Sequence, residues 1–189
     1  MAEGDEAILT LEPLIEAVRE AVEDEGWTLS GLQKTTSHQF EGRWEGDSTR
    51  SAYLFFHPPD GADHVSVDVY LDETSRGLTG NLALVVDLKA FGEMGNVDEA
   101  LGRLGEASAR ELDRRNKRPI TLRFRLADAA EAVEHADTEV RFKVRLPRKS
   151  IAAGMSAIRA FTRETMNGFQ RLRGASELHR FLRPHGDRA

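Results

Sequence analysis

The sequence predicts a single α+β domain in which helices pack on a twisted antiparallel sheet, in the order α-β-β-β-(β)-α-β-β-α. Apolar residues recur every three to four positions in three segments, as in half-buried helices, and every second position in several others, as in strands. The links between the expected strands are short, which favours antiparallel neighbours. We expect this domain to span residues 9–182, between a frayed acidic tail at 1–8 and a disordered tail at 183–189.

The first expected element is a helix that begins after Thr10, a residue type that is favoured at the N-cap position. Gly26 is expected to end it, because glycine is common just after the last helical turn. Between them the apolar stripe consists of Leu11, Leu14, Ile15, Val18 and Val22.

The next region has the period of strands rather than of helices. Thr28–Trp44 is polar and is expected to form an extended edge strand or a loose hairpin. Ser51–His57 is apolar on both of its faces, which predicts a strand that is covered on both sides. His64–Leu71 alternates strictly and follows the turn-forming PPDGAD loop, which predicts a hairpin. Asn81–Leu88 is almost continuously apolar and is expected to be a central strand.

The second half is expected to hold a helix, two strands and a long last helix. Asn96 is a suitable N-cap for the first of these helices. Residues 120–126 and 140–146 alternate as strands, and the Ala-rich link at 127–137 is expected to hold a short helical turn. Ser150 is expected to cap the last long helix, which Gly174 interrupts before a short helix begins at Ser176.

Three stretches together resemble a known layout. They are the opening helix ending in Glu25-Gly26-Trp27, the hairpin LFFHPPDGADHVSVDVYLD, and the hairpin ITLRFRL…EVRFKVRLP that runs into the helix IAAGMSAIRAF. The order of elements resembles the fold shared by class I type III secretion chaperones and YbjN-like bacterial proteins. This resemblance implies a non-enzymatic, often dimeric protein that binds an extended or unfolded segment of a partner. The chain departs from it in its greater length, its basic second half and its long polar first strand.

Charge is unevenly distributed along the chain, whose formal net charge is −6. Residues 1–100 carry 21 acidic and 6 basic residues, whereas residues 101–189 carry 11 acidic and 20 basic residues. Such asymmetry is typical of a surface that binds nucleic acid, lipid or an acidic partner, or of two halves that neutralise each other. We favour neutralisation within one fold or across a dimer.

Two groups of side chains are candidates for partner binding. Alternation along the last two strands predicts five cations on one sheet face, with neither acids nor aromatic residues among them: Arg123, Arg125, Arg141, Lys143 and Arg145. Arginine pairs well with carboxylates, so an acidic protein surface is the favoured target, and nucleic acid is less favoured because base-stacking aromatics are missing. Phe40 and Trp44 are candidate apolar anchors at the end of the polar first strand.

Motifs for catalysis or cofactor binding are not found, so no catalytic residue, metal ligand or cofactor is predicted. The chain has no cysteine and no nucleophile elbow, and its glycine-containing stretches fit neither phosphate-binding pattern. His57 and His64 flank the PPDGAD loop, where a metal site with Asp60 or Asp63 is an alternative to ordinary surface histidines.

These observations predict a cytoplasmic, chaperone- or adaptor-like protein-binding module without a membrane span, which engages a protein partner by its sheet face or edge and admits a homodimer. One alternative is a small-molecule-binding domain or enzyme, with a pocket between the sheet and the last long helix under Met155, Ile158 and Phe169. A third is weak nucleic-acid binding through the basic face.

Overall fold

The computed structural model describes residues 6–37, 49–88, 97–112, 120–125 and 137–179. Asn96, the Ala-rich link at 127–136 and the tail at 183–189 lie outside these ranges. The helices and strands are, in chain order, α1 Leu11–Asp24, β1 Thr28–Ser37, β2 Thr49–His57, β3 Val65–Thr74, β4 Gly77–Leu88, α2 Val97–Glu111, β5 Ile120–Arg125, β6 Asp137–Arg145, α3 Arg148–Ala152, α4 Met155–Arg173 and α5 Ser176–His179.

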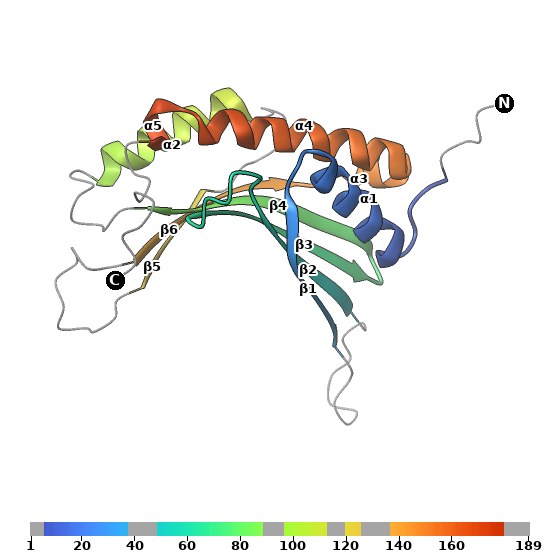
Figure 1. The fold of residues 1–189 in the computed structure, drawn as a ribbon. Coiled ribbons are helices and arrows are strands. Elements are labelled where there is room, and N and C mark those ends of the chain that lie inside the picture. The colour runs from blue at the N-terminus through green and yellow to red at the C-terminus, as the bar shows by residue number, and fades with distance from the viewer. Residues whose placement is uncertain (1–5, 38–48, 89–96, 113–119, 126–136, 180–189) are drawn as a thin grey trace.

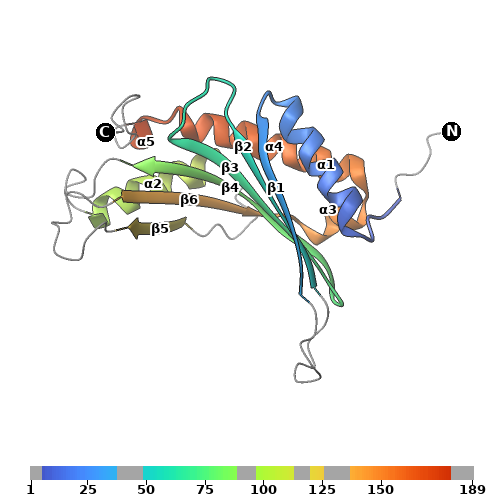
Figure 2. The ribbon, with the colours of Figure 1, turned by 60° about the horizontal axis from the view of Figure 1, so that its bottom comes forward.

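The described strands form one antiparallel sheet in the order β1-β2-β3-β4-β6-β5. The first four strands form a meander, and β6 pairs with β4, so that β5 becomes the second edge. All of the described helices lie on one side of this sheet (Figures 1 and 2), and none of them covers the other side. The predicted α+β class, with helices packed on an antiparallel sheet, is therefore confirmed.

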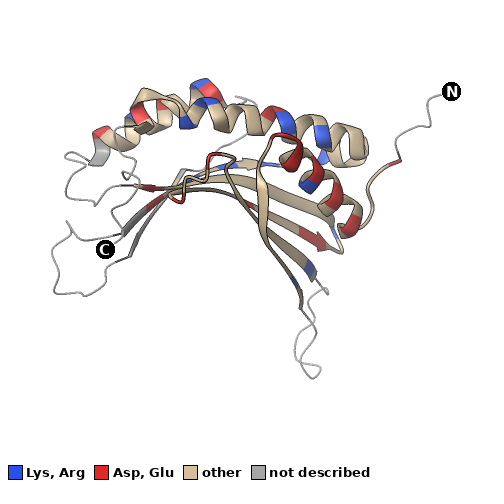
Figure 3. Cartoon of the chain, viewed as in Figure 1, with Lys and Arg blue, Asp and Glu red and all other residues tan. Residues whose placement is uncertain are grey.

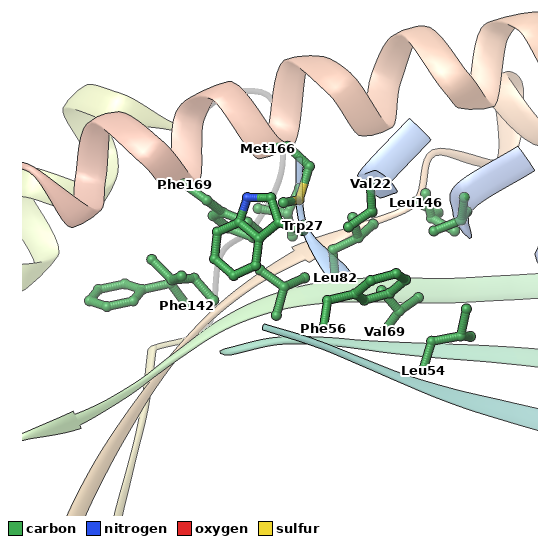
Figure 4. Packing of buried hydrophobic residues seen from close by; sticks show 14 of the residues in the cluster. Val22, Trp27, Leu54, Phe56, Val69, Leu82, Phe142, Leu146, Met166 and Phe169 are labelled. Atoms are coloured by element: carbon green, nitrogen blue, oxygen red, sulfur yellow. The ribbon is translucent and has the colours of Figure 1, made fainter. Parts of the chain in front are cut away.

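The hydrophobic core fills the space between the sheet and the helices. Leu54, Phe56 and Phe142 project from the sheet and are at most 1% exposed. Trp27, which follows α1, is 2% exposed and lies beneath α4 near Phe169 (Figure 4). Burial of this apolar surface is the main driving force for packing the helices on this face.

The first helix has the predicted bounds but begins differently from the prediction. Thr10 occupies the N-cap position, yet its side chain makes no capping hydrogen bond. Instead, the backbone N–H of Leu11 donates to Glu73 Oε2 at 2.7 Å, so a carboxylate of β3 satisfies one of the free N–H groups. Gly26 follows the helix with φ 83°, a conformation that glycine adopts most easily.

The predicted start of the last long helix at Ser150 is wrong. Ser150 lies inside the short helix α3, and α4 begins at Met155. Gly154 separates the two helices with φ 99°, which a residue with a side chain rarely adopts. The short helix expected at Ser176 is confirmed as α5.

Contact with the core begins one residue before the expected start of the domain. Ile8, which falls in the predicted tail, is 6% exposed, and its N–H donates to the carbonyl of Ile151 at 3.2 Å. No described helix is long and apolar enough to cross a membrane.

Ion pairs connect the acidic first half of the chain to its basic second half. Arg159 pairs with Glu20 and Arg163 with Asp24, which joins α4 to α1. Figure 3 shows the acidic positions of α1 beside the basic positions of α4. A further pair joins α4 to the β2–β3 loop through Arg173 and Asp60, and another joins β6 to β3 through Arg141 and Asp68. Part of the charge asymmetry is therefore neutralised within the fold.

Candidate functional site on the uncovered sheet face

The register of the strands defines the residues that share the face opposite the helices. Directly opposed residues lie on the same side of a sheet. One row across the uncovered face is Gly31, Phe55, Asp68, Ala83 and Lys143, from β1 to β6. The next row is Gln33, Tyr53, Tyr70, Asn81 and Arg145.

A hollow of about 410 Å³ lies on this face, mainly between β2 and β6. Ala83 is only 2% exposed, because longer side chains stand on both sides of it. The residues that line the hollow are Tyr53, Phe55, Asp68, Val69, Tyr70, Asn81, Ala83, Arg141 and Lys143. The hollow thus has a low floor on β4 and higher walls on β2, β3 and β6.

One wall of the hollow is aromatic. Tyr53 and Phe55 are 37% and 38% exposed, although they belong to an interior strand. The ring of Tyr53 contacts that of Tyr70, with centroids 4.8 Å apart and planes tilted by 45°. The expectation that β2 is covered on both sides is therefore wrong, since its second apolar face meets no described helix.

The opposite wall carries charge. Arg141 Nη1 lies 3.0 Å from Asp68 Oδ2, and Arg141 Nε donates to Glu139. The Ser66 hydroxyl also donates to Asp68, at 3.1 Å. Burial raises the pKa of the Asp68 carboxyl above its usual value, and the positive charge of Arg141 opposes this shift only in part.

Lys143 differs from its neighbour Arg141. It lines the same hollow, yet it forms no ion pair with any residue that the structure describes. Arg145 follows in the same register, opposite Asn81, and is exposed. Of the two cations that line the hollow, Arg141 is thus paired with acidic residues, whereas Lys143 has no acidic partner in the described ranges.

The prediction that five cations share this face without acids among them is wrong. Arg123 lies opposite Glu139 and Arg125 opposite Asp137 in the β5–β6 register, although the side chains of both arginines are outside the described part. Among the side chains that the structure describes, four acidic residues share the uncovered face by register, namely Asp68, Asp72, Asp87 and Glu139, with three basic residues, namely Arg141, Lys143 and Arg145. The sheet itself therefore supplies compensating charge for these cations.

The expected absence of aromatic residues from this face is also wrong. The sequence pattern that indicates these aromatic residues is the run SAYLFFH, which has apolar residues on both faces. That pattern also favours a strand buried on both sides, which is the interpretation given above. Phe40 and Trp44, the aromatic anchors predicted from the sequence, lie outside the described residues. The structure instead places Tyr53, Phe55 and Tyr70 on the face that carries the cations.

A second hollow, of about 430 Å³, lies at the far end of α4, beside the β2–β3 loop. His64, Arg173 and His179 line it, and Arg173 pairs there with Asp60. Burial opposes ionisation of Asp60, but the hydrogen bonds from Arg173 and from the N–H of Ala62, together with the positive charge of Arg173, outweigh it and lower the pKa of this carboxyl. No group of three or more histidine, aspartate or glutamate side chains among the described residues is arranged to hold a metal ion.

The side chains expected to line a pocket under the last long helix belong to the core. Ile158 and Phe169 are fully buried and Met155 packs against the same cluster. They line neither the hollow on the sheet face nor the one beside the β2–β3 loop.

No protein-family model, no curated protein and no solved structure matches the chain.

Proposed function

We propose that the chain is a non-enzymatic, chaperone- or adaptor-like module that binds a protein partner through the uncovered face of its sheet. The observation that carries this proposal is the pair of exposed aromatic side chains, Tyr53 and Phe55, on one side of the hollow, with Lys143, which has no ion pair among the described residues, on the other side. Large aromatic side chains are enriched at the centres of protein interfaces, and a charged residue is more typical of the surrounding rim. The cytoplasmic location expected from the sequence is part of this proposal.

We propose that the partner binds to the face of the sheet and not to one of its edge strands. The edge strand β1 has an irregularity between Leu29 and Gly31 and carries Lys34 and several hydroxyl residues. Bulges, lysines and short strands are devices that prevent strand addition at an edge, and the other edge, β5, is only 6 residues long. The face, as far as the described residues show it, is not covered by a helix.

Weak nucleic-acid binding remains a second candidate, because the aromatic residues found on this face are able to stack on bases. The charge balance argues against it. Among the described side chains of this face, a polyanion would meet at least as many acidic as basic residues, whereas nucleic-acid affinity depends on an excess of lysine and arginine near the phosphates.

Site-specific photo-crosslinking tests the proposal. A benzophenone amino acid replaces Tyr53 on the uncovered face or, as a control, the exposed residue Ala160 on the outer side of α4. After irradiation in nuclease-treated lysate, position 53 is expected to give a discrete protein adduct that position 160 does not give. An adduct between two copies would identify the partner as a second chain, as in the predicted homodimer. The same set of adducts, or none, at both positions would contradict the proposal.

A further inference from the structure

We propose that the occupant of the uncovered face is an amphipathic helix of the partner, which lies over β3 and β4 with its apolar stripe against Tyr53 and Phe55. A carboxylate flanking that stripe pairs with Lys143. This inference rests on the proposed function and deepens it by naming the structural class of the partner segment.

Backbone hydrogen bonding favours a helix over an extended segment. The strands β2, β3 and β4 are each paired on both sides, and β6 is paired with β4 along 138–145 and with β5 along 137–142, so most of the hydrogen-bonding groups of the backbone beneath the hollow are already used within the sheet. An extended segment laid on this face would leave its own N–H and C=O groups without backbone partners. A helix satisfies these groups internally and presents only side chains.

The spacing of the walls fits one helix. Neighbouring strands lie about 4.8 Å apart, so the aromatic wall on β2 and the cationic wall on β6 are separated by about 14 Å. A helix with its side chains is about 10 Å across. Within this span the floor is lowest on β4, at Ala83 and Asn81, whereas Asp68 and Tyr70 of β3 stand higher, so the helix axis lies nearer to β4 than to β2.

The charged residues that line the hollow indicate which residue the carboxylate of the partner helix contacts. Arg141 is already held between Asp68 and Glu139. Lys143, the next residue on the same face, has no ion pair within the described part of the chain. A single carboxylate beside the apolar stripe therefore complements this wall, whereas a densely acidic helix would also approach Asp68 and Asp72.

Designed peptides of about 18 residues provide the probes. The first is helical, with leucine at positions i, i+3, i+4 and i+7 and one glutamate beside this stripe. The second has lysine in place of that glutamate, and the third has the first composition with two central prolines, which prevent a helix. Binding of each labelled peptide to the full chain is measured by fluorescence anisotropy.

We expect the glutamate peptide to bind and its affinity to fall at least about tenfold in Lys143→Glu, a change equivalent to the loss of one favourable charge pairing. The matched control Lys149→Glu, on the exposed surface of α3, is expected to leave the affinity unchanged. The lysine peptide is expected to recover binding only with Lys143→Glu, because the charge swap restores the pair.

Four results would overturn this inference. The first is that the glutamate peptide does not bind, and the second is that the proline peptide binds as tightly as the glutamate peptide or more tightly. The third is that a labelled oligothymidine binds more tightly than the glutamate peptide. The fourth is that the native chain sediments as a dimer and that Tyr53→Ala converts it to a monomer. The proposed function is judged separately. A protein adduct at position 53 without binding of the helical peptide would retain protein binding and reject the helix, whereas loss of the adduct would reject both.

Discussion

The two faces of the sheet differ most clearly on one strand, β2. Leu54 and Phe56 point toward the helices and are completely buried, whereas Tyr53 and Phe55, which alternate with them, are more than one-third exposed. The covered face belongs to a single hydrophobic core with α1 and α4. The uncovered face combines aromatic rings, a paired arginine and a lysine that has no ion pair with the described residues, all around a hollow.

Under the proposed function, the covered face serves stability and the uncovered face serves binding. Apolar side chains on the covered face lose their contact with water when the chain folds, so they stabilise the fold. The exposed surface of Tyr53 and Phe55 remains in water until a partner covers it, so its burial is available to drive association. On β2, the residues that face the helices therefore stabilise the fold, whereas the residues that alternate with them are available for association.

The largest expected effect comes from truncating a ring on the covered face. Phe56→Ala is expected to lower the free energy of unfolding by about 3–5 kcal/mol, because it leaves a cavity in the core. Phe55→Ala, one residue away, is expected to cost about 1 kcal/mol or less, because much of its ring is already in water. Urea unfolding measures both values, and equal losses would contradict the distinction between the faces.

A smaller effect is expected within the helical layer. A Cβ atom on Gly168 of α4 would lie 2.9 Å from the carbonyl oxygen of Glu111 and 3.0 Å from Leu112 Cδ2. Gly168→Ala is therefore expected to separate α2 from α4 and to cost about 1–3 kcal/mol.

Gly102 provides the matched control for that substitution. It lies on α2, and a Cβ atom added there would meet no other atom within 4 Å. Gly102→Ala is therefore expected to stabilise the chain by up to about 1 kcal/mol through helix propensity. Thermal unfolding of the two variants measures the difference. A shift in the same direction for both would show that the α2–α4 contact is not closely packed.

The smallest expected effect is a pH dependence at the charged wall. Because burial raises the pKa of Asp68, the folded chain binds this proton more tightly than the unfolded chain does. The contribution of Asp68 to stability therefore falls as pH rises from the ordinary value of 3.8 to the raised value. Asp68→Asn removes this dependence, so the variant is expected to gain stability relative to the native chain across that range. Urea unfolding at several pH values tests this, and a difference that does not change with pH would contradict it.

Much of the fold followed from local patterns. The stripe of α1 and the alternation of β3 and β6 each depend on one period along the chain, and the structure has these elements where the sequence predicted them. The start of α4 was missed, because Ser150 is a favourable cap whereas the actual break depends on the backbone conformation of Gly154.

The candidate site was harder to predict, because it depends on which faces the helices leave uncovered. Lys143 was identified from alternation alone. The neighbours of its face come from strands distant in sequence, so the pairing of Arg141 with Asp68 and the position of Tyr53 required the register of β2, β3 and β4. Apolar residues on both faces of a strand indicate two apolar surfaces, and they do not show whether the second surface is covered by the same chain.

The most direct test of the central claim compares adduct yields from the benzophenone at position 53 in two further variants. Phe55→Ala removes a ring from the uncovered face, whereas Leu32→Ala removes an exposed side chain, 43% accessible, that is opposite Leu54 and therefore on the other side of the sheet. We expect Phe55→Ala to reduce the yield at least about fivefold and Leu32→Ala to leave it unchanged, since contacts at the centre of an interface dominate its affinity. Equal yields in the two variants would show that the uncovered face is not the binding surface.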